Sequence, residues 1–144
     1  MKVRMEVGTL ARTADISRPR VVVADDNPGC LNQICSLIEN RFEVVARAVN
    51  GLECVEAVRT YSPSVVVTDI SMPKMNGIEA TRAIAKVAPD VRVVILSGHD
   101  DPAFIEAAID AGASAYVVKL SAFQDLIPAI EEVAAGRSYL PAFG

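Results

Sequence analysis

The sequence holds a single histidine, His99, and only three cysteines, Cys30, Cys35 and Cys54. A metal centre built on histidine or cysteine needs several such ligands at regular spacing, so we expect neither that kind of site nor a disulfide framework. The same shortage argues against a catalytic triad that depends on histidine. We expect the three cysteines to be reduced and to pack as small apolar side chains.

Long apolar runs, low-complexity stretches and an excess of positive charge are also missing. Apolar runs such as Val93 to Leu96 are far shorter than the ~18 residues of a membrane span, and the N-terminus has no apolar signal-peptide core. Eight glycines and eight prolines among 144 residues are ordinary for a globular chain. The net charge of −4 argues against direct nucleic-acid binding by this chain. The sequence therefore predicts a cytoplasmic protein with one folded domain.

The pattern of the chain divides it into three parts. Residues 1–19 have mixed polarity without a period, and we expect a poorly ordered leader, with a basic contact arm as the alternative. Residues 20–140 alternate short β-branched runs with helical segments, and residues 141–144 begin a linker or tail. The expected strands are Arg20–Asp25, Val44–Val49, Val65–Asp69, Arg92–Ser97 and Ala115–Lys119.

Strict alternation of strands and helices is typical of an α/β fold with a doubly wound, five-stranded parallel sheet. Continuous apolar strands fit a sheet that is covered on both faces, whereas Arg47 interrupts the second strand and places it at an edge. Asn27 and Asp101 each precede a proline suited to the first helical position. Three pairs have the spacing of a capping box: Asn50 with Glu53, Asn76 with Glu79, and Ser121 with Gln124.

Polar residues stand where the apolar strands end: Asp25 and Asp26, Asp69, Ser97 and Lys119. Ligands of open α/β sheets bind outside the carboxyl ends of the strands. If the strand order is 2-1-3-4-5, the first and third strands are neighbours and the three aspartates converge. Each residue alone has an ordinary explanation as a turn, a helix cap or a solvated charge, but their joint placement indicates a site.

Three carboxylates at close range repel one another, and a hard divalent cation such as Mg²⁺ relieves that repulsion. Lys119 supplies a point charge for a phosphate oxygen, and Ser97 can donate a hydrogen bond to another. Asp69 then has the surroundings of a carboxylate nucleophile that accepts a phosphoryl group.

Three segments carry a family resemblance: DISMPKMNGIEATRAI around Asp69, LSGHDD at Ser97, and AGASAYVVK ending in Lys119. Together with Asp25-Asp26 they resemble the receiver domain of two-component response regulators, over about Arg20 to Leu140. The resemblance implies a flavodoxin-like (CheY-like) receiver fold with strand order 2-1-3-4-5. The segments MNGIEATRAI and AAGRSYLP are most similar to the NarL/FixJ type.

The resemblance implies that a sensor histidine kinase phosphorylates Asp69, which makes the domain a switch rather than an enzyme. Mg²⁺, or another divalent cation such as Mn²⁺, would be held by Asp26, Asp69 and the backbone carbonyl of Ser71. Asp25 would assist indirectly, through a hydrogen bond or a bound water.

The resemblance also assigns a switch. Ser97 and Lys119 would hold the phosphoryl oxygens, and Tyr116 matches an aromatic position that reorients when the hydroxyl residue moves toward the phosphate. Ser71 and His99 match positions that tune the lifetime of the phosphate in the family. For Tyr116 the alternative is an ordinary strand aromatic, and for His99 a solvated loop residue.

Partners follow from the resemblance as well. A homodimer would form through the fourth helix, fifth strand and fifth helix, or through the first helix. NarL/FixJ proteins usually continue into a DNA-binding domain that regulates transcription, but only eight residues follow Gly136, so we expect that domain to be absent from this chain. A stand-alone receiver and a pseudo-receiver that acts as a protein-interaction module are the alternatives.

A flavodoxin-like cofactor binder and an aspartate-dependent phosphatase are less consistent with the residues. The loop DDNPG presents two carboxylates where a flavin phosphate would need amides and hydroxyls, and Ser71 stands where such a phosphatase would carry a second acid.

Two positions depart from the family pattern. Leu120 follows Lys119 where many receivers have a proline after a cis peptide bond, so we expect a trans bond or a strained exception. Pro128 falls within the fifth helix and predicts a kink there, or a helix that begins near Pro128.

Overall fold

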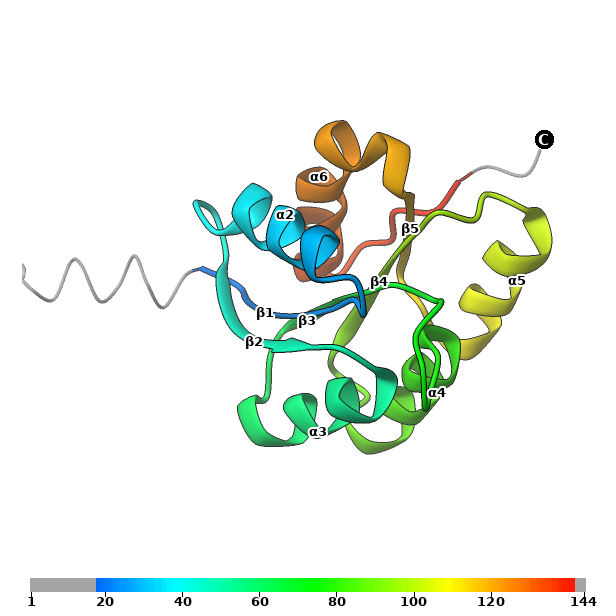
Figure 1. Ribbon diagram of the computed structural model, residues 1–144, viewed down its shortest axis with the longest axis horizontal. Helices are drawn as coiled ribbons and strands as arrows, with labels where there is room; N and C mark the ends of the chain where they lie inside the picture. Colours follow the sequence, from blue (N-terminus) through cyan, green and yellow to red (C-terminus); the bar gives the residue numbers. More distant parts are fainter. Residues whose placement is uncertain (1–17, 142–144) are drawn as a thin grey trace, which may run out of the picture.

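The computed structural model describes residues 18–141, so residues 1–17 of the predicted leader and 142–144 of the predicted tail lie outside the described part. Five parallel strands form one sheet in the order β2-β1-β3-β4-β5, with helices on both faces (Figure 1), which confirms the predicted fold. The strands are β1 (Arg20–Ala24), β2 (Glu43–Ala48), β3 (Val65–Thr68), β4 (Arg92–Ser97) and β5 (Ala115–Val118). The helices are α2 (Pro28–Ile38), α3 (Gly51–Tyr61), α4 (Gly77–Val87), α5 (Pro102–Ala111) and α6 (Ala122–Ala134).

Alternate residues of the central strands face two helix layers. In β1, Val21 and Val23 pack in a cluster with α2 and α6, whereas Val22 and Ala24 pack with α3, α4 and α5. All four side chains are fully buried, as expected for a parallel sheet that is covered on both faces. The strand that carries exposed Arg47, β2, lies at an edge of the sheet, as predicted.

Asparagine side chains begin three of the helices. Asn27, Asn50 and Asn76 each accept a hydrogen bond from the backbone N–H three residues on, which satisfies a donor at the helix start. At Asn76 the Glu79 carboxylate returns the bond, so the predicted capping box is confirmed. These caps fix the residues at which α2, α3 and α4 begin after the strands that precede them.

The other two predicted capping boxes are not formed as expected. Glu53 accepts a hydrogen bond from the N–H of Val49 at 3.0 Å, one residue before the helix cap. Ser121 makes no capping bond, because it ends a short 3-10 turn at Lys119–Ser121. Its backbone (φ −101°, ψ 6°) is not in the extended conformation from which a cap side chain reaches back.

Helix α6 runs continuously through Pro128, so the prediction of a helix that begins near Pro128 is wrong. The missing proline N–H frees the carbonyl of Gln124, an exposed residue that water can reach. The opposite side of the helix buries Leu126 and Ile130 completely, and this packing holds the helix together around the proline. The Lys119–Leu120 peptide bond is trans, which is the first of the two outcomes that the sequence left open.

The first and last described residues pack against the sheet domain. The Arg18 guanidinium donates to the carbonyls of Glu39 and Phe42 (2.9 and 2.8 Å), at the end of α2 and just beyond it. Beyond α6 the chain returns along the outer edge of β5, where Tyr139 forms a parallel bridge with Ala115. The family resemblance did not predict this last contact.

Candidate functional site

Asp25 and Asp26 leave the carboxyl end of β1 in opposite situations. The Asp25 side chain is fully buried, while Asp26 is exposed. One carboxylate oxygen of Asp25 accepts a hydrogen bond from the N–H of Asn27 at 2.9 Å, which fixes its orientation at the start of α2. The other oxygen remains for a partner from across the sheet.

Asp69 stands beside this pair because β1 and β3 are neighbours in the sheet. Its backbone N–H donates to the carbonyl of Ala24 at 3.0 Å, which continues the β1–β3 pairing to the residue after β3. One oxygen of its nearly buried carboxylate accepts a hydrogen bond from the N–H of Ile70 at 2.7 Å. Backbone hydrogen bonds thus hold the Asp69 main chain against β1 and fix one oxygen of its carboxylate.

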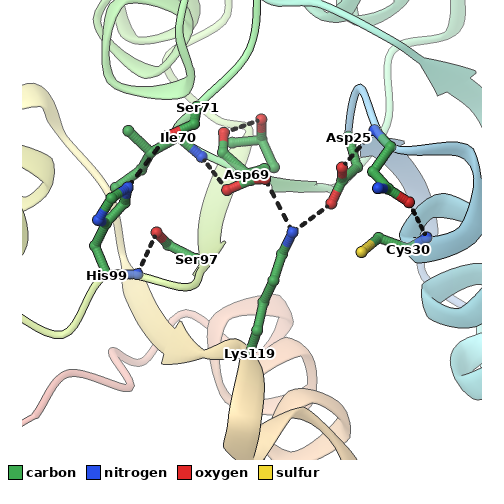
Figure 2. Close-up of polar contacts among 10 residues, drawn as sticks. Asp25, Cys30, Asp69, Ile70, Ser71, Ser97, His99 and Lys119 are labelled. Atoms are coloured by element: carbon green, nitrogen blue, oxygen red, sulfur yellow. Dashed lines mark hydrogen bonds and ion pairs between the residues drawn. The ribbon is translucent and has the colours of Figure 1, made fainter.

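Lys119 reaches this pair of carboxylates from the end of β5 (Figure 2). Its Nζ donates to Asp25 Oδ2 at 2.8 Å and to Asp69 Oδ2 at 2.9 Å. Partial burial opposes the charge of the ammonium group, but the hydrogen bonds and charges of the two aspartates outweigh burial and raise the pKa of Lys119 above its usual value. The lysine is therefore a fixed cation that neutralises part of the acidic cluster.

The predicted convergence of the three aspartates is present. Carboxylate oxygens of Asp25, Asp26 and Asp69 all lie within 4.8 Å of one another. A single lysine charge leaves the three carboxylates with an excess of negative charge. A set of carboxylate oxygens, partly open to solvent through Asp26, fits a hard divalent cation such as Mg²⁺ that keeps some of its waters.

Two glycines hold the loop that follows Asp69, and the sequence reasoning did not single them out. A Cβ atom at Gly77 would overlap the carbonyl oxygen of Asp69, and one at Gly51 would overlap the carbonyl oxygen of Met75. The Gly77 N–H donates to the carbonyl of Ile70 at 2.8 Å, and the Gly51 N–H donates to that of Met75 at 2.8 Å. The Asn76-Gly77 pair at the start of α4 is the sequence signal that could have identified this close approach, because glycine lets two backbones come this near to each other.

Ser97 is fully buried at the end of β4, and its hydroxyl accepts the N–H of His99 at 3.0 Å. Tyr116, 4% exposed on β5, donates its hydroxyl to the carbonyl of His99 at 2.7 Å. Burial raises the pKa of the Tyr116 hydroxyl, so the phenol stays a donor at neutral pH. Both predicted switch residues thus meet at His99.

His99 also connects the loops that follow β3 and β4. Its Nε2 lies 3.1 Å from the hydroxyl of Ser71, and its ring stacks on Phe104 with centroids 4.2 Å apart (Figure 2 shows the Ser71 contact). Contacts of the side chain and of both backbone groups tie His99 to neighbouring elements. This residue is therefore not the freely solvated loop residue of the alternative interpretation.

An apolar groove of about 770 Å³ adjoins the site between α2 and the start of α6. Leu37, Leu96 and Lys119 contribute to its lining, as do Leu120 and Phe123, which are 98% and 85% exposed. Large apolar side chains this exposed are typical of a surface that binds another protein.

Among the helices of residues 18–141, none is both long enough and apolar enough to cross a membrane.

Comparisons with known proteins agree with the geometry. Residues 21–131 match the family described as "Response regulator receiver domain". The chain is 39% identical over 123 residues to the transcriptional regulatory protein DegU of Brevibacillus brevis, covering 84% of this chain and 52% of that protein. It is 38% identical over 122 residues to the transcriptional regulatory protein PdtaR of Mycobacterium tuberculosis, covering 82% and 58%. The chain thus spans about half the length of these curated relatives.

Solved structures give the same assignment. A LuxR-family two-component response regulator from Aurantimonas sp. SI85-9A1 superposes with a TM-score of 0.82 at 38% identity, covering 85% of this chain and 89% of that one. The receiver domain of RcsB from Salmonella enterica serovar Typhimurium, determined with phosphomimetic BeF₃⁻, superposes with a TM-score of 0.79 at 25% identity, covering 87% and 94%. This chain therefore belongs to the receiver domains of two-component response regulators and is most similar to those of the NarL/LuxR type.

Proposed function

We propose that this receiver domain is a switch controlled by phosphorylation of Asp69. The observation that carries the proposal is the cluster of Asp25, Asp26 and Asp69, with Lys119 bonded to two of its members. Structural packing alone does not require a fully buried carboxylate beside a second, nearly buried one. A phosphoryl-transfer site does, because it needs a fixed nucleophile and fixed charges around it.

In the proposed reaction an oxygen of the Asp69 carboxylate forms a bond to phosphorus as the bond between phosphorus and the kinase histidine breaks. The histidine nitrogen takes the electron pair of the broken bond, and Asp69 becomes an acyl phosphate. The hydrogen bond from the Ile70 N–H holds the carboxylate so that it does not need to reorient before attack.

A bound Mg²⁺ or Mn²⁺ would neutralise charge on the transferred group. The residues proposed to hold the ion are Asp26, Asp69 and the backbone carbonyl of Ser71, with Asp25 acting indirectly. Asp25 is held by Asn27 and Lys119, and Asp26 is exposed, which supports this division between an indirect and a direct role.

Lys119 and Ser97 are proposed to receive the phosphoryl oxygens. Lys119 contacts Asp69 already, so its ammonium group can move from the carboxylate to a phosphoryl oxygen while staying in the site. The Ser97 hydroxyl accepts the N–H of His99 and keeps its own O–H as a donor, so a side chain that turns toward the phosphoryl group to donate this O–H changes its contact with His99. That movement alters the surroundings of Tyr116, whose hydroxyl is bonded to the same residue, His99.

The proposed partners of this cytoplasmic receiver are a sensor histidine kinase and a DNA-binding output domain of the kind that transcriptional regulators carry. The exposed Leu120 and Phe123 beside Lys119 support this proposal, because they would offer the kinase an apolar docking surface next to the acceptor. Homodimerisation through α5, β5 and α6, or through α2, would transmit the phosphorylated state.

The test is incubation with Mg²⁺ and a small acyl phosphate, followed by intact mass measurement. We expect one added phosphoryl group that hydroxylamine removes, because acyl phosphates react with this nucleophile. Asp69→Ala should remain unmodified, whereas Asp110→Ala on the exposed side of α5 should be modified like the parent protein. A parent protein that stays unmodified would instead favour a pseudo-receiver that binds its partner without phosphorylation.

A further inference from the structure

Beyond α6 the chain forms a short strap, which we define as Arg137–Pro141, along the outer edge of β5 (Figure 1). Gly136 turns the chain back with φ of 89°, a conformation that favours glycine. The N–H of Tyr139 then donates to the carbonyl of Ser114 at 2.9 Å, and the carbonyl of Tyr139 accepts the N–H of Tyr116 at 3.1 Å. These two bonds add one rung to the sheet beyond β5.

Side chains fasten the strap to α6. The Tyr139 hydroxyl donates to Asp125 Oδ1 at 3.2 Å, and Arg137 pairs with Glu132 through two hydrogen bonds at 2.8 and 2.9 Å. Tyr139 is half-buried against the cluster formed with α2 and α6, whereas the other strap residues are exposed. A segment held by one rung, one half-buried aromatic side chain and one exposed ion pair can open without disrupting the domain.

Tyr116 connects the strap to the phosphorylation site. Its backbone N–H binds the strap, and its side-chain hydroxyl binds the carbonyl of His99, whose N–H in turn binds Ser97. One residue therefore participates in both the proposed switch and the attachment of the strap.

A hollow of about 580 Å³ lies between α5 and the strap, and Tyr116, Ile105, Tyr139 and Leu140 contribute to its lining. A Tyr116 ring that leaves its buried position beside His99 has this space to enter. In the hollow it would meet Tyr139 and Leu140 and push the strap outward. The buried ring, by contrast, does not contact the position of the strap from the hollow, so the strap can remain bound to β5. This is the arrangement in the structure.

We infer that the strap is an output element controlled by the Tyr116 ring. The buried ring keeps the strap on β5, whereas a ring that turns into the hollow loosens the strap. The inference rests on the proposed phosphorylation of Asp69 and names the segment that responds to it. Ser97 and the Tyr116 hydroxyl both bond to His99, so a Ser97 side chain that turns toward the phosphoryl group changes the contacts around the buried ring. In this inference phosphorylation favours the buried ring and the seated strap, and any domain that follows the strap is held closer in that state.

The experiment measures strap attachment and site occupancy in the same sample. The full chain is treated with Mg²⁺ with and without beryllium trifluoride, whose binding is followed by fluorine NMR. Trypsin cleavage after Arg137 and hydrogen exchange at the Tyr139 and Tyr116 amides report the strap. We expect beryllium trifluoride to slow both the cleavage and the exchange several-fold.

Variants separate the coupling from simple packing. Tyr139→Pro removes the N–H that binds Ser114, and Tyr139→Phe removes only the bond to Asp125. By linkage, a variant whose strap is fully open should weaken beryllium trifluoride binding by the factor by which the bound group protects the strap in the parent protein, and Tyr139→Phe, which keeps the backbone bonds, should weaken it by less. Tyr61→Phe, an exposed tyrosine on α3, is the matched control and should leave binding and cleavage unchanged.

Two failures are distinguishable. If beryllium trifluoride does not bind the parent protein, the proposed function fails. If it binds while the strap is cleaved and exchanges at the same rate with and without it, the coupling is wrong and the strap is only a packed terminus. Unchanged binding in both Tyr139 variants would also overturn it.

Discussion

Lys119 is the residue on which the electrostatics of the site depend. Asp25 is fully buried and Asp69 nearly so, and the same ammonium group bonds to both. Removing one partner of a buried ion pair leaves the other charge without compensation, which usually costs more than the pair contributed. Here two carboxylates would be left, facing each other.

We expect Lys119→Met to lower the free energy of unfolding by about 2 kcal/mol at neutral pH, less than the 3–5 kcal/mol of a fully buried pair because the lysine is partly solvated. Urea denaturation measures this, with Lys86→Met on the exposed surface of α4 as the control. Added Mg²⁺ should restore part of the loss in Lys119→Met, since the ion replaces the missing positive charge. Equal losses for both variants would mean that Lys119 is an ordinary surface lysine.

Ionisation of the buried Cys54 thiol would lower the free energy of unfolding. Burial raises the pKa of its thiol from 9.0 to about 12. Between these values the folded protein keeps a proton that the unfolded chain releases, so the free energy of unfolding falls as the pH rises through this window. At pH 10.5 the loss from this group is about 2 kcal/mol.

Denaturation at pH 8 and at pH 10.5 tests this, with Cys54→Ala compared with the parent protein. The variant should be less stable at pH 8, because it leaves a cavity, but its stability should fall less between the two pH values. The half-exposed Cys30→Ala is the control and should follow the parent protein. Parallel curves for Cys54→Ala and the parent would show that the thiol does not contribute to alkaline unfolding.

At the scale of the elements, the start of α4 holds the loop after the phosphoacceptor in place. Gly77 is the first residue of this helix and lies against the backbone of Asp69 and Ile70. Helix propensity alone favours alanine over glycine by about 1 kcal/mol, whereas overpacking costs about 1–3 kcal/mol. The two effects have opposite signs, so a single substitution decides between them.

We expect Gly77→Ala to lower the free energy of unfolding by about 2 kcal/mol, because the added methyl group overlaps the Asp69 carbonyl. Chemical denaturation gives the value. Gly98→Ala is the matched control, since a Cβ there meets nothing within 4 Å, and it should change stability by less than about 0.5 kcal/mol. A Gly77→Ala protein more stable than its parent would mean that the loop moves aside at little cost.

The elements also show which sequence signals are local and which are not. The caps at Asn27, Asn50 and Asn76 depend on backbone three residues away, and the sequence predicts them well. The cap at Ser121 fails because β5 runs first into a 3-10 turn. Spacing identifies a side chain that could cap a helix, but the conformation of the preceding segment decides whether it does.

For the whole molecule, the parallel sheet and its acidic edge could be predicted from one regularity, the alternation of apolar strands and helices, whereas the strand order came from the family resemblance. Parallel strands end at one edge, so residues that follow apolar runs, such as Asp25, Asp69 and Lys119, are brought together by the fold. Contacts between loops and between termini have no such period. Two such contacts are the one between Ser71 and His99 and the bridge from Tyr139 to Ala115. Both join segments far apart in the sequence, and no local sequence pattern predicts them.

The acidic cluster links the stability of the whole domain to divalent cations. An ion that binds the folded protein but not the unfolded chain stabilises it by about 1.4 kcal/mol at ten times its dissociation constant. We therefore expect Mg²⁺ to raise the melting temperature of the unphosphorylated protein, as measured by calorimetry over a range of Mg²⁺ concentrations at constant ionic strength. Asp26→Asn should abolish the shift by removing the exposed ligand, whereas Asp110→Asn should keep it. A shift of equal size in both variants would place the ion elsewhere on the molecule.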